Sequence, residues 1–209
     1  TNALGDVLDS HSQMKYWFEP YFVWDRYFRD AKDDVRLAKH YTPEVANSIK
    51  KEFSRFQKRF QCDLVLDKSP RNSLKIPFIR KMFPEAKIIH VVRDGRDVIA
   101  SINREWLQRV NVYGEQKANV DYKKAFSILM KWLKKQPAWD YRIRAFWHET
   151  HGHLVNKSKH TNRMRWDWKI GFGPQFSDWR KTLQECSLLQ FNAYQWLNCI
   201  KSVQNEWRI

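Results

Sequence analysis

Two anion-binding side chains stand at a fixed spacing in the middle of the chain. Arg93 directly follows the apolar run 88–92, and Ser101 comes eight residues later. The run is continuous and rich in β-branched residues, which predicts a buried strand. The turn 93–96 then leads into a predicted helix, on which Ser101 shares a face with Arg104. A guanidinium and a hydroxyl near a helix N-terminus favour a phosphate group by charge, dipole and hydrogen bonding.

The elements that must position this site alternate between strands and helices. Leu64-Val65-Leu66 predicts a short strand, and Thr42-Pro43-Glu44 is typical of a helix start, with an N-cap and a first-turn proline. His90 lies inside the apolar run and is expected to be a core residue. Such alternation is typical of α/β proteins, which bind ligands at the carboxyl ends of their strands. Further helices are predicted over 3–9, 69–82 with an interruption at Pro77, 122–136, 139–149 and 184–203, and loops over 152–163 and 171–178.

The Arg93-x7-Ser101 spacing resembles the 3′-phosphate motif of the sulfotransferase superfamily, whose members use 3′-phosphoadenosine 5′-phosphosulfate (PAPS). The spelling Arg93-Asp94-Gly95-Arg96-Asp97-Val98 supports the resemblance. An upstream Asp67-Lys68-Ser69-Pro70 segment matches the pattern of the bacterial-type and tyrosylprotein-like branches. The likeness extends over residues 16–109, with a weaker echo at 177–180. It implies an α/β, P-loop-like three-layer sulfotransferase fold with a short parallel sheet, helix-rich and incomplete at both ends, forming a single domain over 1–209.

The resemblance also implies roles for individual residues. Glu19 lies in the aromatic segment Tyr16–Phe22 and is the candidate general base, because burial among apolar side chains tunes a carboxyl group toward proton transfer near neutral pH. A salt bridge or simple exposure is the structural alternative for Glu19. Lys68 would stabilise the leaving oxygen. Arg93, Ser101 and Arg104 would bind the donor's 3′-phosphate, with Arg71 as a second anion contact. The expected partners are PAPS, its product PAP, and an acceptor such as a carbohydrate or another hydroxyl compound or amine; no metal is required.

One family feature does not occur in the sequence. Sulfotransferases bind the 5′-phosphosulfate with a Gly/Ser/Thr-rich loop between the first strand and the first helix, and none of the six glycines stands in such a context. By the resemblance, Thr1 falls just after the end of that loop, so we expect the strand and loop to lie upstream. Without them, the chain would instead be a non-catalytic module that binds a nucleotide or a sulfated glycan.

The composition describes a strongly basic chain with a substantial core. The 209 residues carry a net charge of +15 and 15% aromatic residues, and the aromatic content excludes global disorder. Basic and aromatic residues interleave between 123 and 165, a pattern that single-stranded nucleic acid can bind by charge and stacking. A basic nucleic-acid-binding protein is therefore a further alternative to the enzyme, although solvated helix faces explain the same pattern and we do not expect nucleic acid as a partner.

The remaining signals argue against metal and disulfide chemistry. Cys62, Cys186 and Cys199 are scattered, which disfavours a zinc site or a disulfide framework and favours a reducing compartment. The histidines in 148–153 lack the H-E-x-x-H spacing, and a solvated loop is expected there. The apolar runs fall short of the about 18 residues that a membrane span needs.

Overall fold

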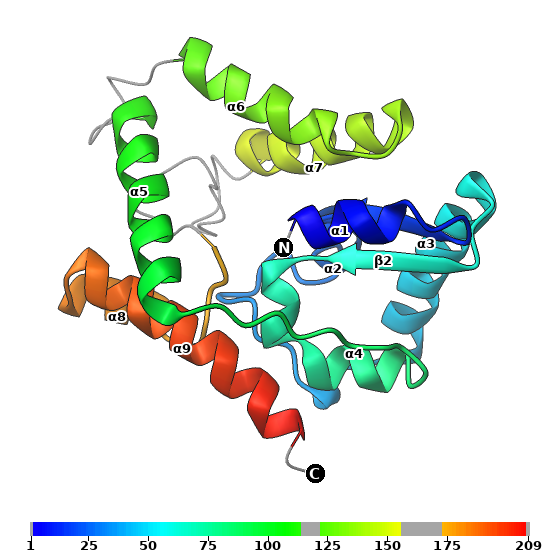
Figure 1. Cartoon of the computed structure of the whole chain (residues 1–209), viewed down its shortest axis with the longest axis horizontal. Coiled ribbons are helices and arrows are strands. Elements are labelled where there is room, and N and C mark those ends of the chain that lie inside the picture. Colours follow the sequence, from blue (N-terminus) through cyan, green and yellow to red (C-terminus); the bar gives the residue numbers. More distant parts are fainter. Residues whose placement is uncertain (1, 114–121, 156–172, 208–209) are drawn as a thin grey trace.

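The centre of the fold is a two-stranded parallel sheet. The computed structural model describes residues 2–113, 122–155 and 173–207 (Figure 1). Strand β1 (Met14–Phe18) pairs with β2 (Leu64–Lys68) in a register that places Phe18 opposite Lys68. The sequence predicted β2 and overlooked β1, whose residues belong to the aromatic segment. Within the described residues neither strand has a second partner.

Helices cover both faces of this sheet. On one face, α1 (Asn2–Asp9) approaches β1 so closely that a Cβ on Gly5 would lie 2.7 Å from the Tyr16 ring, so only glycine fits there. On the other face, Trp17 stacks on Phe56 of α3 (Pro43–Phe60) with 4.2 Å between ring centroids. Side chains alternate between the faces of a strand, which explains why neighbouring residues serve opposite layers.

The predicted start of α3 is confirmed by its cap. The Thr42 hydroxyl accepts a hydrogen bond from the Val45 N–H at 3.3 Å, and Pro43 occupies the first turn. Pro77 likewise stands in the first turn of α4 (Ile76–Met82), after the 3-10 helix η2 (Pro70–Leu74), so the predicted interruption is also confirmed. The short helices α2 (Tyr21–Trp24) and η1 (Ala38–His40) complete this half of the fold.

In the second half, every regular element that the structure describes is a helix. Its helices are α5 (Gly95–Tyr113), α6 (Tyr122–Lys134), α7 (Trp139–Val155), α8 (Trp179–Glu185) and α9 (Leu188–Trp207). Helix α9 packs against α5, α4 and η2 (Figure 1). One hydrophobic cluster surrounds Trp17 and extends to α6 and α7, and a second surrounds Trp179 between α5, α8 and α9.

The predicted strand over 88–92 is wrong. This segment runs without regular structure between α4 and α5, and Ile89 and Val92 are 60% and 59% exposed. A strand exists only where another strand completes its hydrogen-bond ladder. Among the described residues β2 pairs with β1 alone, so this apolar run has no strand beside it. His90 is correspondingly only partly buried, not a core residue.

Two further boundaries differ from prediction. The expected helix over 184–203 is two helices, α8 and α9, because Ser187 starts a new helix: its N–H donates to Gln190 Oε1 and its hydroxyl accepts from the Gln190 N–H. Helix α7 continues to Val155, so the histidine-containing run 148–153 is helical rather than a loop. The part of the predicted loop over 152–163 that follows residue 155 lies outside the described residues, whereas 173–178 is a loop as expected.

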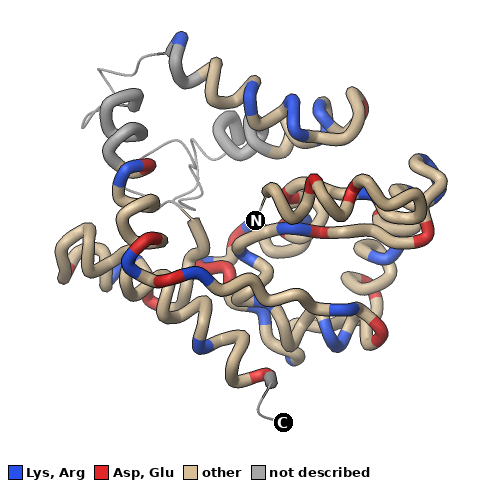
Figure 2. Tube along the Cα trace, in the orientation of Figure 1, with Lys and Arg blue, Asp and Glu red and all other residues tan. Residues whose placement is uncertain are grey.

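The observed architecture is α/β and helix-rich, with a short parallel sheet as predicted. Lys and Arg are spread over most elements and line α6 in particular (Figure 2). The described part of the chain contains no helix long and apolar enough to span a bilayer. It also contains no cluster of three or more His, Cys, Asp or Glu side chains suited to hold a metal ion.

Candidate active site

Glu19 and Lys68 meet at the carboxyl end of the sheet, although 49 residues separate them in the sequence. Lys68 ends β2 and Glu19 directly follows β1, so the parallel register brings them side by side. Lys68 Nζ lies 3.2 Å from Glu19 Oε1, and the two side chains are 18% and 16% exposed. The structure thus brings together the two predicted catalytic residues in an ion pair that solvent can still reach.

The backbone at Glu19 is held in an uncommon conformation. Its φ is +44°, in the left-handed region that non-glycine residues rarely adopt. The Glu19 N–H donates to the Lys68 carbonyl at 3.2 Å, and the Tyr21 N–H donates to the Glu19 carbonyl at 2.7 Å. Such conformations cost about 1–3 kcal/mol and are retained where the surrounding structure fixes them, often at functional sites. The tight turn points to a functional constraint on Glu19.

The turn that follows α6 reaches the same strand end. Gln136 Nε2 donates to the Phe18 carbonyl at 3.1 Å across 118 residues, and Gln136 is buried. The ammonium groups of Lys68 and Lys135 lie 5.0 and 4.9 Å from the centroid of the Phe18 ring. Two cations therefore contact the Phe18 ring, which directly precedes Glu19, an arrangement suited to negative charge on a bound molecule.

Behind this pair lies the carboxyl group of Asp67. Its Oδ2 accepts hydrogen bonds from Trp24 Nε1 at 2.6 Å and from Asn72 Nδ2 at 3.0 Å. Burial raises the pKa of Asp67 from 3.8 to about 6, despite these two donors. Asp67 is the first residue of the family-like segment Asp67-Lys68-Ser69-Pro70, but only Lys68 of this segment received a predicted role.

Asp67→Asn should change how stability depends on pH. Between pH 3.8 and 6 the folded chain holds a proton on Asp67 that the unfolded chain releases, so this carboxyl group's contribution to the free energy of unfolding decreases as pH rises. The difference in unfolding free energy between wild type and Asp67→Asn should therefore fall by about 2 kcal/mol from pH 4 to pH 7. Urea denaturation at both pH values measures it, and parallel pH profiles for the two proteins would contradict the assignment.

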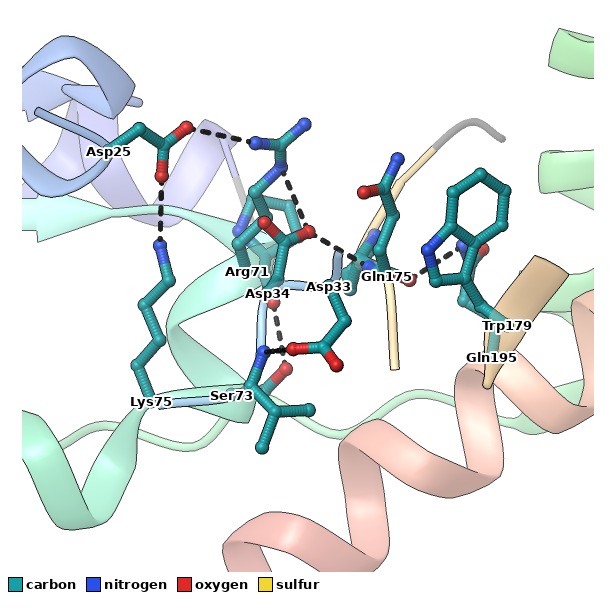
Figure 3. Close-up of polar contacts among 12 residues, drawn as sticks. Asp25, Asp33, Asp34, Arg71, Ser73, Lys75, Gln175, Trp179 and Gln195 are labelled. Carbon is teal, nitrogen blue, oxygen red and sulfur yellow. Dashed lines mark hydrogen bonds and ion pairs between the residues drawn. The ribbon is translucent and has the colours of Figure 1, made fainter. Parts of the chain in front are cut away.

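A buried ionic cluster adjoins the site (Figure 3). Arg71 Nη1 lies 3.3 Å from Asp25 and its Nε 3.4 Å from Asp34, while Lys75 Nζ lies 3.5 Å from Asp25. Burial opposes the charged form of Arg71, yet Asp34 and Asp25 raise its pKa above the ordinary value. The guanidinium also lies 4.4 Å from the centroid of the Tyr21 ring. Arg71 was predicted to contact an anion of the substrate; here it is engaged by two carboxylates of the protein.

The predicted 3′-phosphate residues lie just before α5 and within its first three turns. Arg93 is exposed and interacts with Asp97, donating to its carbonyl at 3.2 Å and lying 3.8 Å from its carboxylate. Ser101 is half-buried and Arg104 is exposed on the same helix. In the part of the chain that the structure describes, no hydrogen bond joins Arg93 to Ser101, and the strand expected before Arg93 is absent. Their role in binding a nucleotide stays a prediction.

Comparison with known proteins settles the family. The family model described as "Sulfotransferase family" matches residues 1–149, which is more than half of the chain and includes every predicted site residue. The chain belongs to the sulfotransferase family. Searches among curated proteins and among solved structures each gave no match. For this sulfotransferase-family chain, membership supports group transfer as the reaction class, and the Glu19–Lys68 pair is the candidate centre for it.

Proposed function

We propose that this chain transfers a sulfuryl group from PAPS to an acceptor hydroxyl or amine. The observation that carries the proposal is the Glu19–Lys68 ion pair at the carboxyl ends of two parallel strands, in a chain of the sulfotransferase family. Ligands of α/β proteins bind at that end of the sheet. A carboxylate and an ammonium at one point supply a proton acceptor and a positive charge, the two groups that sulfuryl transfer requires from the protein.

In this reaction the acceptor oxygen or nitrogen forms a bond to sulfur while the bond from sulfur to the 5′-phosphate oxygen breaks. Glu19 takes the proton that the acceptor loses, and PAP leaves with the bonding electron pair on its phosphate oxygen. Lys68 stabilises the negative charge that develops on this oxygen. As in phosphoryl transfer, positioning and charge stabilisation account for most of the protein's contribution.

We further propose that Arg93, Ser101 and Arg104 hold the 3′-phosphate of the donor. Support comes from the family motif and from the place of Arg93 two residues before the N-terminus of α5, where the helix dipole favours an anion, with Ser101 and Arg104 following in the second and third turns. To bind a phosphate, the Arg93 guanidinium must exchange its contact with Asp97 for the ligand. Because both groups of that contact are exposed, the exchange costs little.

Calorimetry with PAP tests the nucleotide site. Arg93→Ala and Ser101→Ala should each weaken PAP binding about 10- to 100-fold, the loss expected for a charge-assisted phosphate contact. Arg96→Ala is the matched control, because Arg96 lies in the same turn, pairs with Asp94 and is 92% exposed. Unchanged affinity in both site variants would remove the assignment.

Two other outcomes would favour the alternative functions. PAP binding without sulfuryl transfer would favour a non-catalytic binding module, and a preference for oligonucleotides over PAP would favour nucleic-acid binding.

For the fold, we propose the P-loop-like three-layer arrangement within one domain over 1–209. In this arrangement the run 88–92 becomes a strand when a further strand, carrying the 5′-phosphosulfate loop, pairs beside it. Support comes from the exposure of Ile89, Val91 and Val92 and from the edge of β2, which has no further partner in the described chain. A structure with PAP bound tests it: irregular backbone at 88–92 in that complex would contradict the arrangement.

A further inference from the structure

The two segments that leave the sheet at the candidate site are tied to one atom. The first follows Glu19 and forms α2, and the second follows Lys68 and forms η2. Asp67 Oδ2 accepts from Trp24 at the end of α2 at 2.6 Å and from Asn72 within η2 at 3.0 Å. A single carboxylate oxygen thus joins both chain segments directly after the ion pair.

Asp67 cannot itself touch the reacting groups. It lies opposite Trp17 in the register, and Trp17 is fully buried among the core rings. Lys68 and Phe18 lie on the opposite face of the sheet, because side chains alternate along a strand. Among the described residues, Asp67 makes no hydrogen bond to the ion pair and, besides the repulsion between its carboxylate and that of Glu19, acts on the pair through the backbone segments that it holds.

We propose that Asp67 is a positioning residue whose hydrogen bonds to Trp24 and Asn72 fix the placement of Glu19 against Lys68. The proposal rests on the proposed function, because it assumes that this pair performs the transfer. A purely structural role would be filled better by an apolar residue, since burying a carboxyl group costs more than burying a hydrocarbon of similar size. Asp67 Oδ1 shows this cost: it is buried and has no hydrogen-bond partner among the described residues.

The two hydrogen bonds of Asp67, to Trp24 and Asn72, are called the clamp. The left-handed backbone of Glu19 explains why the candidate site needs them. With φ at +44°, this residue is held away from the conformations that a free chain prefers. The turn is closed on one side by the Lys68 carbonyl and continues into α2, whose last residue is Trp24. Releasing Trp24 from Asp67 would let the turn relax, and the Glu19 carboxylate would move away from the Lys68 ammonium.

Three variants separate positioning from simple stability. Asp67→Leu removes the acceptor and keeps the branched shape of the side chain, and Asp67→Asn keeps one acceptor oxygen for both donors. Asp63→Leu is the control, because Asp63 is exposed and lies just before the opposite end of β2. The first readout is the ¹³C shift of the Glu19 carboxyl group and the ¹⁵N shift of the Lys68 ammonium at pH 7, with Lys68→Met as the reference for a broken pair. The second is kcat and KM for sulfuryl transfer.

We expect the Asp67→Leu shifts to approach those of the broken pair, with kcat lower by about 10- to 100-fold at unchanged PAP affinity. Asp67→Asn should restore the wild-type shifts and most of kcat. If Asp67→Leu does not fold, Asn72→Ala and Trp24→Phe each remove one donor and should perturb Lys68 and Glu19 respectively. Wild-type shifts in every variant without the clamp would overturn the proposal. A wild-type chain without transferase activity would refute the proposed function. The chemical shifts of Glu19 and Lys68 would still show whether the hydrogen bonds of Asp67 hold the two side chains together.

Discussion

Replacing Glu19 with glutamine is expected to lower kcat for sulfuryl transfer by about 10²- to 10⁴-fold, the usual contribution of a positioned general base. Glutamine keeps the size of the side chain and can still contact Lys68, 3.2 Å away in the wild type, but it cannot accept a proton. Binding of PAP should be unchanged, because the proton leaves the acceptor and not the donor. Transfer of labelled sulfate from PAPS to a panel of hydroxyl and amine acceptors measures the effect.

The exposed Glu105, on α5, supplies the control for this experiment, and Glu105→Gln should retain the wild-type kcat. Combining Glu19→Gln with Lys68→Met should cost less than the sum of the two single effects, because residues that act as a unit are not additive. A Glu19→Gln enzyme with undiminished kcat would assign the base to another residue.

Replacing Arg71 with methionine is expected to destabilise the fold by about 3–5 kcal/mol, the usual cost of removing one partner from a buried ionic contact. The guanidinium lies 3.3 Å from Asp25 and 3.4 Å from Asp34, and both carboxylates are almost completely buried. Lys75 remains near Asp25, so Asp34 is the group left without a cation. Denaturation in urea at pH 7 gives the change in unfolding free energy.

The exposed ion pair of Arg96 with Asp94 provides the comparison. Arg96→Met removes the same guanidinium from the surface, where water replaces its contacts, and should leave the unfolding midpoint unchanged. An equally small effect for Arg71→Met would mean that Asp34 takes up a proton or water at little cost, and that the cluster does not stabilise the fold.

Local signals in the sequence predicted the elements that they directly encode. The Thr42 cap and Pro43 marked the start of α3, and Pro77 marked the boundary between η2 and α4. Glu19 and Lys68 were selected separately, from an aromatic segment and a family motif, and the parallel register places them in contact. Their spatial meeting required β1, which the sequence did not predict because an aromatic run has no clear alternation.

Features that depend on distant partners escaped prediction. The run 88–92 has the composition of a buried strand, but composition does not provide the neighbour that a strand requires. The cluster of Asp25, Asp34, Arg71 and Lys75 arises from segments that meet only in the folded chain. The break between α8 and α9, in contrast, could have been found: Ser187-x-x-Gln190 carries the capping signature of a helix start.

The backbone contact between Asp34 and Gln175 links the family-matched region to the rest of the chain. Asp34 donates its N–H to the Gln175 carbonyl at 2.7 Å, and its carboxylate oxygen Oδ2 accepts from the Gln175 N–H at 2.9 Å and also faces Arg71 (Figure 3). Trp179 adds a hydrogen bond to the Lys32 carbonyl. A fragment cut at residue 149 would open this junction to water and separate Asp34 from its tether. The described segment that contains Gln175 and Trp179 thus supports the loop around Asp34 next to the candidate site, and shortened forms of the chain should be designed to keep it.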